Sequence, residues 1–248
     1  MTGASIRISS LSAWFSDTQV LQDVSVELRP NRITALIGST GSGKTTLLRC
    51  CNRLAELEPR FRSRGEVLLD DQAIAQFPAA DLRRKVGMVF ERPTAFSRSL
   101  EDNLAFGLAL AGIGRVERER RIEAALRAAD LFDELGDLSA PAASLDSGSR
   151  QLLCIARALA LEPSALLLDE PTRWLHPAEG ARVERVVAGL RDRVTIILAT
   201  SDTALAGRLA DDVALLQEGR LVEYGATEDV FTAPRRPETE AYLTRRYR

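Results

Sequence analysis

The chain has 248 residues, of which 45% are hydrophobic and 27% charged, and its formal net charge is −2. This composition is typical of a folded globular domain with a large core, and the small net charge gives no general attraction for nucleic acid. We therefore expect no nucleic-acid partner. No apolar run approaches the roughly 20 residues that a membrane-spanning helix needs, so we expect any membrane role to depend on another protein.

The first third of the chain has the patterns of several strands. Residues 5–28 alternate apolar and polar side chains in the manner of two strands, and Ile33–Ile37 is a short apolar run typical of a buried strand. Helical spacing follows over 46–50, and residues 66–69 and 86–90 are further predicted strands.

Helical patterns dominate the middle of the chain, and strands and helices alternate again afterwards. Residues 99–129 have helical spacing. The later predicted elements are a helix over 151–161, a strand over 165–168, a helix over about 177–191, a strand over 194–199, and a hairpin of 212–217 with 220–224. The alternation predicts an α/β fold with a mainly parallel sheet, an N-terminal antiparallel β part and an inserted helical part. We expect one domain over 1–248, with its core over about 1–90 and 151–248 and a helical subdomain over about 91–150.

The three cysteines are Cys50, Cys51 and Cys154. Two are adjacent, their number is odd, and their spacing matches no metal site. All three lie in apolar helical contexts, which predicts reduced thiols in the core.

The most informative motif is a glycine-rich loop between the strand Ile33–Ile37 and the next helix. Residues 38–45 read G-x-x-x-x-G-K-T, and this strand–loop–helix context is that of a phosphate-binding loop. Backbone N–H groups and the helix N-terminus would bind a polyphosphate, Lys44 would reach its β- and γ-phosphates, and the Thr45 hydroxyl would bind Mg²⁺. The alternative is a glycine-rich turn that ends in Lys-Thr by chance. The predicted binding residues are Gly38, Ser39, Thr40, Gly41, Ser42, Gly43, Lys44, Thr45 and Thr46.

A second motif follows the apolar strand 165–168, which ends in Asp169 and Glu170. Asp169 would hold Mg²⁺ and Glu170 would polarise an attacking water. Two carboxylates after a buried strand can also be a simple turn cap, but together with the glycine-rich loop they indicate a nucleotide-hydrolysing site.

With residues 145–151 just before the helix at 154–159, these motifs make the chain resemble the ATP-binding cassette (ABC) ATPases. The resemblance covers nearly the whole chain and is greatest to the ATP-binding subunits of bacterial phosphate importers. It rests further on residues 48–53, 87–96, 153–159 and 219–225. It implies a P-loop NTPase (RecA-like) core, ATP and Mg²⁺ as cofactors, and a face-to-face dimer with each ATP between one subunit's phosphate loop and the other's signature motif.

The resemblance also implies partners and further site residues. Phe15 matches the aromatic position that stacks on adenine, and the signature motif corresponds to Asp146, Ser147 and Gly148. The groove near Arg92 and Phe96 matches the one that receives an integral-membrane permease. The second ATP-binding subunit would be the same chain or a different one, and the complex would lie at the cytoplasmic face of the plasma membrane.

Four positions depart from the family pattern. Glu91 replaces a glutamine that contacts Mg²⁺ and the attacking water, and a carboxylate there can still bind Mg²⁺. His176, the only histidine, replaces the D-loop aspartate and would add a titratable group at the dimer seam, although a plain surface histidine fits as well. Ser201 replaces the switch histidine that touches the γ-phosphate, and it is too short to substitute for an imidazole.

Asp146 is the most severe departure, because the family places there a serine that donates to the γ-phosphate of the opposite subunit's ATP. Two unit charges about 4 Å apart repel by roughly 4 kcal/mol at an effective dielectric constant of about 20. Asp146 also suits a helix N-cap, and both roles can hold together.

We therefore predict the ATP-binding subunit of an ABC importer, most like phosphate import, with impaired hydrolysis. The alternative is a non-catalytic ATP-binding protein that scaffolds or regulates a transporter. The candidate catalytic residues are Glu170, Glu91 and Ser201, and the candidate Mg²⁺ ligands are Thr45, Asp169 and Glu91.

Overall fold

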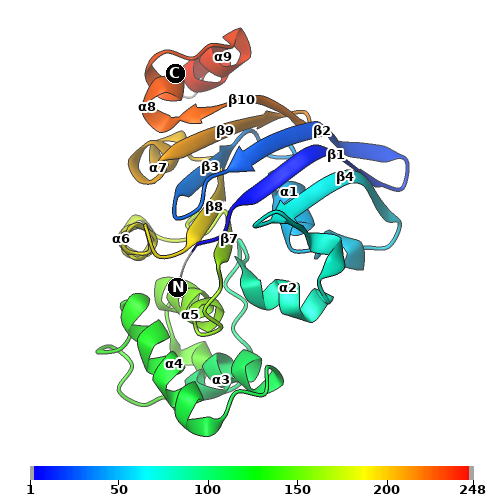
Figure 1. Cartoon of the computed structure of the whole chain (residues 1–248). Coiled ribbons are helices and arrows are strands. Elements are labelled where there is room, and N and C mark those ends of the chain that lie inside the picture. Colours follow the sequence, from blue (N-terminus) through cyan, green and yellow to red (C-terminus); the bar gives the residue numbers. More distant parts are fainter. Residues whose placement is uncertain (1–2, 246–248) are drawn as a thin grey trace.

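Two sheets and a group of helices make up the computed structural model, which describes residues 3–245 (Figure 1). The strands are β1 (Ile6–Phe15), β2 (Thr18–Leu28), β3 (Ile33–Ile37), β4 (Phe61–Leu69), β5 (Gln72–Ala73), β6 (Val86–Val89), β7 (Ala165–Asp169), β8 (Thr195–Thr200), β9 (Asp212–Gln217) and β10 (Arg220–Ala226). The helices are α1 (Lys44–Cys51), α2 (Ala79–Lys85), α3 (Leu100–Leu110), α4 (Arg115–Ala128), α5 (Ser147–Leu159), α6 (Pro177–Gly189), α7 (Thr203–Leu209), α8 (Thr227–Thr232) and α9 (Pro237–Arg245).

The larger sheet has the strand order β10-β9-β3-β8-β7-β6. Its strands are parallel from β9 to β6, and β10 pairs antiparallel with β9. Strands β3, β7 and β8 are buried along their whole length, as expected where helices cover both faces of a parallel sheet. The predicted mainly parallel sheet is confirmed.

This strand order brings four distant segments to one edge. The carboxyl ends of parallel strands meet at the same edge of a sheet, and β3, β8, β7 and β6 are consecutive neighbours. The glycine-rich loop follows β3, Ser201 follows β8, Asp169 ends β7, and Glu91 follows β6 closely.

The smaller sheet is antiparallel, with the order β2-β1-β4-β5, as predicted for the N-terminal part of the chain. Its apolar face packs on the glycine-loop helix α1, and Leu21, Val24, Leu47 and Leu48 share one core cluster there. This packing holds α1 between the two sheets, so the loop that precedes α1 has a fixed position.

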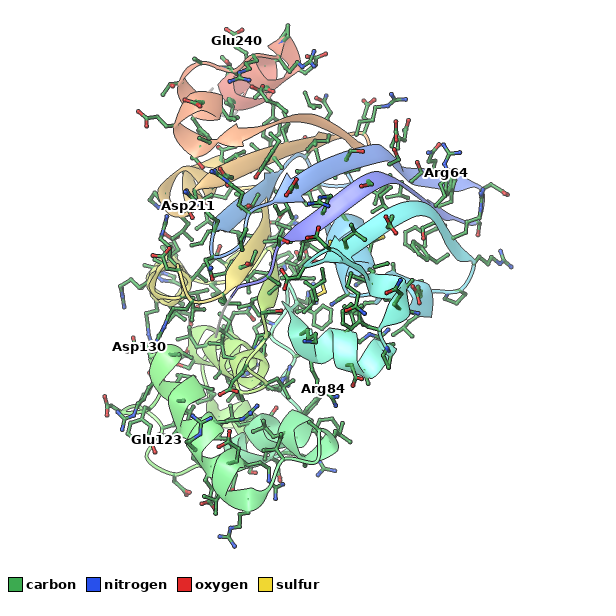
Figure 2. The ribbon with its side chains drawn as sticks, viewed as in Figure 1. Arg64, Arg84, Glu123, Asp130, Asp211 and Glu240 are labelled. Atoms are coloured by element: carbon green, nitrogen blue, oxygen red, sulfur yellow. The ribbon has the colours of Figure 1, made fainter. Side chains whose placement is uncertain are left out.

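Helices α3, α4 and α5 pack together at one end of the molecule, away from α8 and α9 (Figure 1). Helix α4 buries Ile122, Ala125 and Leu126 and exposes several of its charged residues, among them Glu123, which extends outward in Figure 2. Helix α5 is buried along most of its length and belongs to the same core cluster as β7, so the boundary expected at about residue 150 falls inside a helix that joins the helical part to the sheet.

Most of the predicted elements are present with shifted ends. Strand β4 begins at Phe61 rather than at 66, and α5 begins at Ser147 rather than at 151, because Asp146 caps it. The sequence patterns did not predict α2, α7, α8 or α9. All three cysteines are buried free thiols, as predicted, and burial raises the pKa of Cys50 to about 12. None of the helices in the described part of the chain has both the length and the apolar composition for crossing a bilayer.

Candidate functional site

The glycine-rich loop turns back tightly between β3 and α1. Gly38 has φ 151° and Gly43 has φ 104°, which are conformations that side chains rarely allow. A Cβ atom on Gly38 would lie 2.1 Å from the carbonyl oxygen of Leu216, and one on Gly43 would lie 2.9 Å from Leu21 Cδ2. Glycine is therefore required at both positions by backbone conformation and by the close approach of β9 and β2.

Lys44 begins α1 and its side chain is only 6% exposed. Its ammonium donates to the carbonyl oxygens of Gly38 (2.8 Å) and Ser39 (3.1 Å), and it lies 3.8 Å from Glu170 Oε1. The loop thus holds a buried positive charge at its own mouth, next to the end of β7.

The loop borders a hollow of about 210 Å³ that contains groups of both charges. Loop residues, Lys44 and Thr45 line it together with Glu91, Glu170 and Arg173. The first turn of α1 carries no acidic residue, so nothing on that turn opposes an anion at the helix N-terminus. Within residues 3–245, the buried Ser42 hydroxyl of the loop has no hydrogen-bond partner, although Ser42 is not among the residues that line the hollow.

Thr45 and Asp169 supply one hydroxyl and one carboxylate for a metal ion. Thr45 Oγ1 donates to Asp169 Oδ1 at 3.0 Å, and burial raises the pKa of Asp169. The described residues contain no group of three or more His, Cys, Asp or Glu side chains arranged to hold a metal. Protein sites commonly bind Mg²⁺ through one or two side chains together with substrate phosphates and water, and a hydroxyl and a carboxylate are oxygen ligands of the kind that Mg²⁺ takes.

Glu170 is nearly buried and has φ 44°, a strained conformation for a residue other than glycine. Its carboxylate accepts hydrogen bonds from Ser201 Oγ (3.4 Å) and Thr200 Oγ1 (3.5 Å), both at the end of β8. Its N–H donates to the carbonyl oxygen of Ala199 at 2.8 Å. The neighbouring strand thereby fixes the position of this carboxylate beside Lys44.

Glu91 lines the hollow but points to partners that the sequence analysis did not single out. Trp174 Nε1 donates to Glu91 Oε1 at 2.9 Å, and a guanidinium nitrogen of Arg173 lies 3.3 Å from the same oxygen. The guanidinium carbons of Arg92 and Arg173 lie 5.3 and 5.5 Å from the centre of the Trp174 ring. The sequence does contain a signal for this contact, because Arg173 and Trp174 lie between Glu170 and His176, which are both candidate site residues.

The predicted signature residues lie at the start of α5 and none of them lines the hollow. Asp146 accepts a hydrogen bond from the Ser149 N–H at 2.8 Å, so the N-cap interpretation is confirmed. That backbone hydrogen bond is also the main reason that the pKa of Asp146 is lowered. Gly148 packs so closely on α6 that an added Cβ atom would lie 2.7 Å from Glu179 Cβ.

His176 and Phe15 have local partners of their own. His176 is exposed and caps α6 in a capping box with Glu179, so it has a structural use besides the predicted one. Phe15 ends β1, and its half-buried ring lies 5.3 Å from the ring of Phe61. Phe15 does not line the hollow beside Lys44.

Comparison with known proteins gives consistent results. Residues 21–173 match the ABC transporter family. The chain is 42% identical over 250 residues to the phosphate import ATP-binding protein PstB 1 of Yersinia pestis bv. Antiqua (strain Antiqua), which covers 98% of this chain and 91% of that protein. It is 41% identical over 244 residues to the phosphate import ATP-binding protein PstB of Idiomarina loihiensis, which covers 97% of this chain and 90% of that protein.

Solved structures with the same fold include one of cbiO1 from Clostridium perfringens, described as part of the ABC transporter complex cbiONQ. It has a TM-score of 0.80 and 28% identity over 92% of this chain and 90% of that one. A bacterial Atm1-family ABC exporter with ATP bound has a TM-score of 0.81 over 99% of this chain and 42% of that one, but at 22% identity it shows the fold alone. The predicted α/β fold with a P-loop NTPase core is confirmed.

Proposed function

The chain belongs to the ABC transporter family, as an ATP-hydrolysing subunit, and on that premise we propose that it drives phosphate import. The supporting observation is the strand order β3-β8-β7-β6, which gathers the glycine-rich loop, Ser201, Asp169 with Glu170, and Glu91 at one sheet edge. The relatives named as phosphate import proteins support the choice of solute. No residue of an ATP-binding subunit needs to touch the solute, so the family likeness alone carries this part of the proposal.

The proposed roles follow from the contacts. ATP would bind with its phosphates on the loop 38–43, beside Lys44 and the N-terminus of α1. Thr45 and Asp169 would hold Mg²⁺, which supplies positive charge to the phosphate oxygens when bound. Glu170 would accept a proton from the attacking water. Hydrogen bonds from Ser201 and Thr200 would hold the Glu170 carboxylate in place.

We propose that two ATP-binding subunits meet face to face, because the start of α5 lies outside the hollow of its own chain. Phe96 and Phe106, which are 40% and 47% exposed, form an edge-to-face pair with ring centres 5.2 Å apart. Phe96 lies in the same loop as Arg92, between β6 and α3, and Phe106 lies in α3. This exposed apolar pair is the proposed docking site of the permease. The subunit would then act at the cytoplasmic face of the plasma membrane through that partner.

Slow hydrolysis is part of the proposal. An aspartate is ionised at neutral pH, and the pKa of Asp146 is lowered further by its hydrogen bond from the Ser149 N–H, so its carboxylate would repel the triphosphate of a facing subunit. The same observation favours the second candidate function, an ATP-binding protein that regulates a transporter without hydrolysing ATP.

The test measures ATP binding and hydrolysis by the purified protein, alone and with the permease subunits in lipid vesicles. We expect ATP binding that Lys44→Ala weakens sharply, and slow hydrolysis that the permease and phosphate accelerate. Unchanged ATP binding in Lys44→Ala would remove the loop assignment. Binding without hydrolysis under any condition would favour the regulatory function.

A further inference from the structure

Arg173 is the second positively charged residue at the hollow. It follows Glu170 by three positions, and its N–H donates to the carbonyl oxygen of Glu170 at 3.2 Å in a turn before α6. Its side chain lines the same hollow as Lys44 and Thr45 and is 37% exposed. The guanidinium therefore lies at the solvent side of the hollow, whereas the ammonium of Lys44 is buried in the loop.

Each of these two cations is paired with a carboxylate of the hollow. Lys44 lies 3.8 Å from Glu170, and Arg173 lies 3.3 Å from Glu91. A triphosphate brings several negative charges next to these carboxylates and to Asp169. Binding it against three acidic groups is unfavourable unless the nearby cations turn to the phosphates.

A guanidinium suits this task better than a second ammonium. Its planar fork binds two oxygens of a phosphate at once, and such charge-assisted pairs are stronger than neutral hydrogen bonds. The Arg173 side chain is partly exposed, and an exposed ion pair such as that with Glu91 contributes little free energy, so breaking it for a phosphate costs little. Ser201, on the neighbouring strand end, is a neutral donor that already contacts Glu170.

Trp174 keeps Glu91 partnered after such a movement. Its indole N–H holds Glu91 Oε1 at 2.9 Å independently of Arg173. Trp174 is 56% exposed, and its ring makes cation–π contacts with the guanidinium groups of both Arg92 and Arg173. Glu91 would retain one hydrogen bond, and Trp174 one cation, once the second guanidinium is withdrawn.

We propose that Arg173 binds the terminal phosphate of the nucleotide held on its own chain's glycine-rich loop, in exchange for its ion pair with Glu91. This inference rests on the proposed function, since it requires that the loop binds ATP. Arg173 is then a nucleotide-binding residue that distinguishes a triphosphate from a diphosphate. The role of the Glu91 carboxylate is to neutralise Arg173 while no nucleotide is bound.

The experiment measures the affinities of the full-length protein for ADP and for the non-hydrolysable ATP analogue AMP-PNP by calorimetry. We expect Arg173→Gln to weaken AMP-PNP binding by roughly tenfold or more while ADP binding changes by less than about twofold. Arg173→Lys should fall between, because it keeps the charge and loses the fork. Arg115→Gln, a change of an exposed arginine on α4, is the matched control and should alter neither affinity.

Glu91→Gln should act in the opposite direction. Without the carboxylate, Arg173 has no ion pair to give up, so in Mg²⁺-free buffer AMP-PNP should bind more tightly relative to ADP than in the wild type. Trp174 gives a second readout, because the chain has only two tryptophans. In a Trp14→Phe background, AMP-PNP should change the tryptophan emission more than ADP does, and Arg173→Gln should abolish that difference.

Equal weakening of both nucleotides by Arg173→Gln, or no weakening of either, would overturn the inference and leave the proposed function standing. Wild-type protein that binds neither nucleotide would overturn the proposed function, and the inference with it.

Discussion

Thr45 donates a 3.0 Å hydrogen bond to Asp169, which joins the first turn of α1 to the end of β7, although β8 separates β7 from β3. The bond connects the two motifs that the sequence presents 124 positions apart. It places side by side the hydroxyl and the carboxylate that are proposed to hold Mg²⁺.

Asp169→Asn should make the nucleotide-free protein more stable at neutral pH. Burial raises the pKa of Asp169 above its ordinary value of 3.8, so the fold disfavours the ionised form, and that cost is present above the folded pKa and disappears as the pH falls through it. Asparagine keeps an acceptor for Thr45 without the charge. Urea unfolding at about pH 7 and about pH 4 should show a gain that shrinks at the lower pH. The same variant should lose the Mg²⁺ dependence of ATP binding, and a stability loss at both pH values would contradict the prediction.

Glu170→Gln should abolish most of the hydrolysis while leaving ATP binding intact. The amide preserves the shape of the side chain and can still accept from Ser201 and Thr200, but it cannot take a proton from water. Loss of a general base typically lowers the rate by about 10²–10⁴-fold. The measurement is the single-turnover rate with Mg²⁺-ATP, and a rate unaffected by the change would exclude Glu170 as the base.

Changing Asp146→Ser, His176→Asp and Ser201→His together should raise the rate of hydrolysis. We expect the fold to accept these changes, because Ser and Asp are both good N-caps for α5 and α6, and Ser201 is only half-buried at the end of β8. Removing the Asp146 carboxylate also removes the repulsion expected at the facing subunit. Steady-state ATPase rates of the triple variant and of each single variant check this. If the triple variant hydrolyses ATP no faster than the wild type, the proposal of impaired hydrolysis is wrong.

Asp146→Ala should destabilise the protein by about 1 kcal/mol, the usual cost of losing an N-cap, whereas Asp146→Asn keeps the cap and should cost less. The Ser149 N–H lowers the pKa of Asp146, so its ionised form stabilises the fold above the ordinary value of 3.8, and this stabilisation is lost as the pH falls through the lower folded pKa. Unfolding curves should therefore show that the advantage of wild type over Asp146→Asn disappears in acid. An advantage that persists there would mean that the charge of Asp146 does not contribute.

Local patterns were sufficient for much of this molecule. The apolar run Ile33–Ile37 followed by glycines and Lys44 identifies a strand, a loop and a helix, because each depends on residues next to one another in the chain. The apolar run before Asp169 and Glu170 identifies β7 for the same reason. The boundaries were less certain, since the N-cap at Asp146 starts α5 four residues earlier than the apolar spacing alone indicates.

The sequence by itself determined the alternation of strands and helices, the phosphate-binding loop and the buried state of the cysteines, all of which follow from short-range spacing and hydrophobicity. Only the tertiary structure decided which strand ends are neighbours, and hence that Glu91 lies against Arg173 and Trp174 and that Ser201 touches Glu170. Strand order is set by how the sheets and helices pack as a whole. Contacts between residues about 80 positions apart leave no periodic pattern in the chain that forms them.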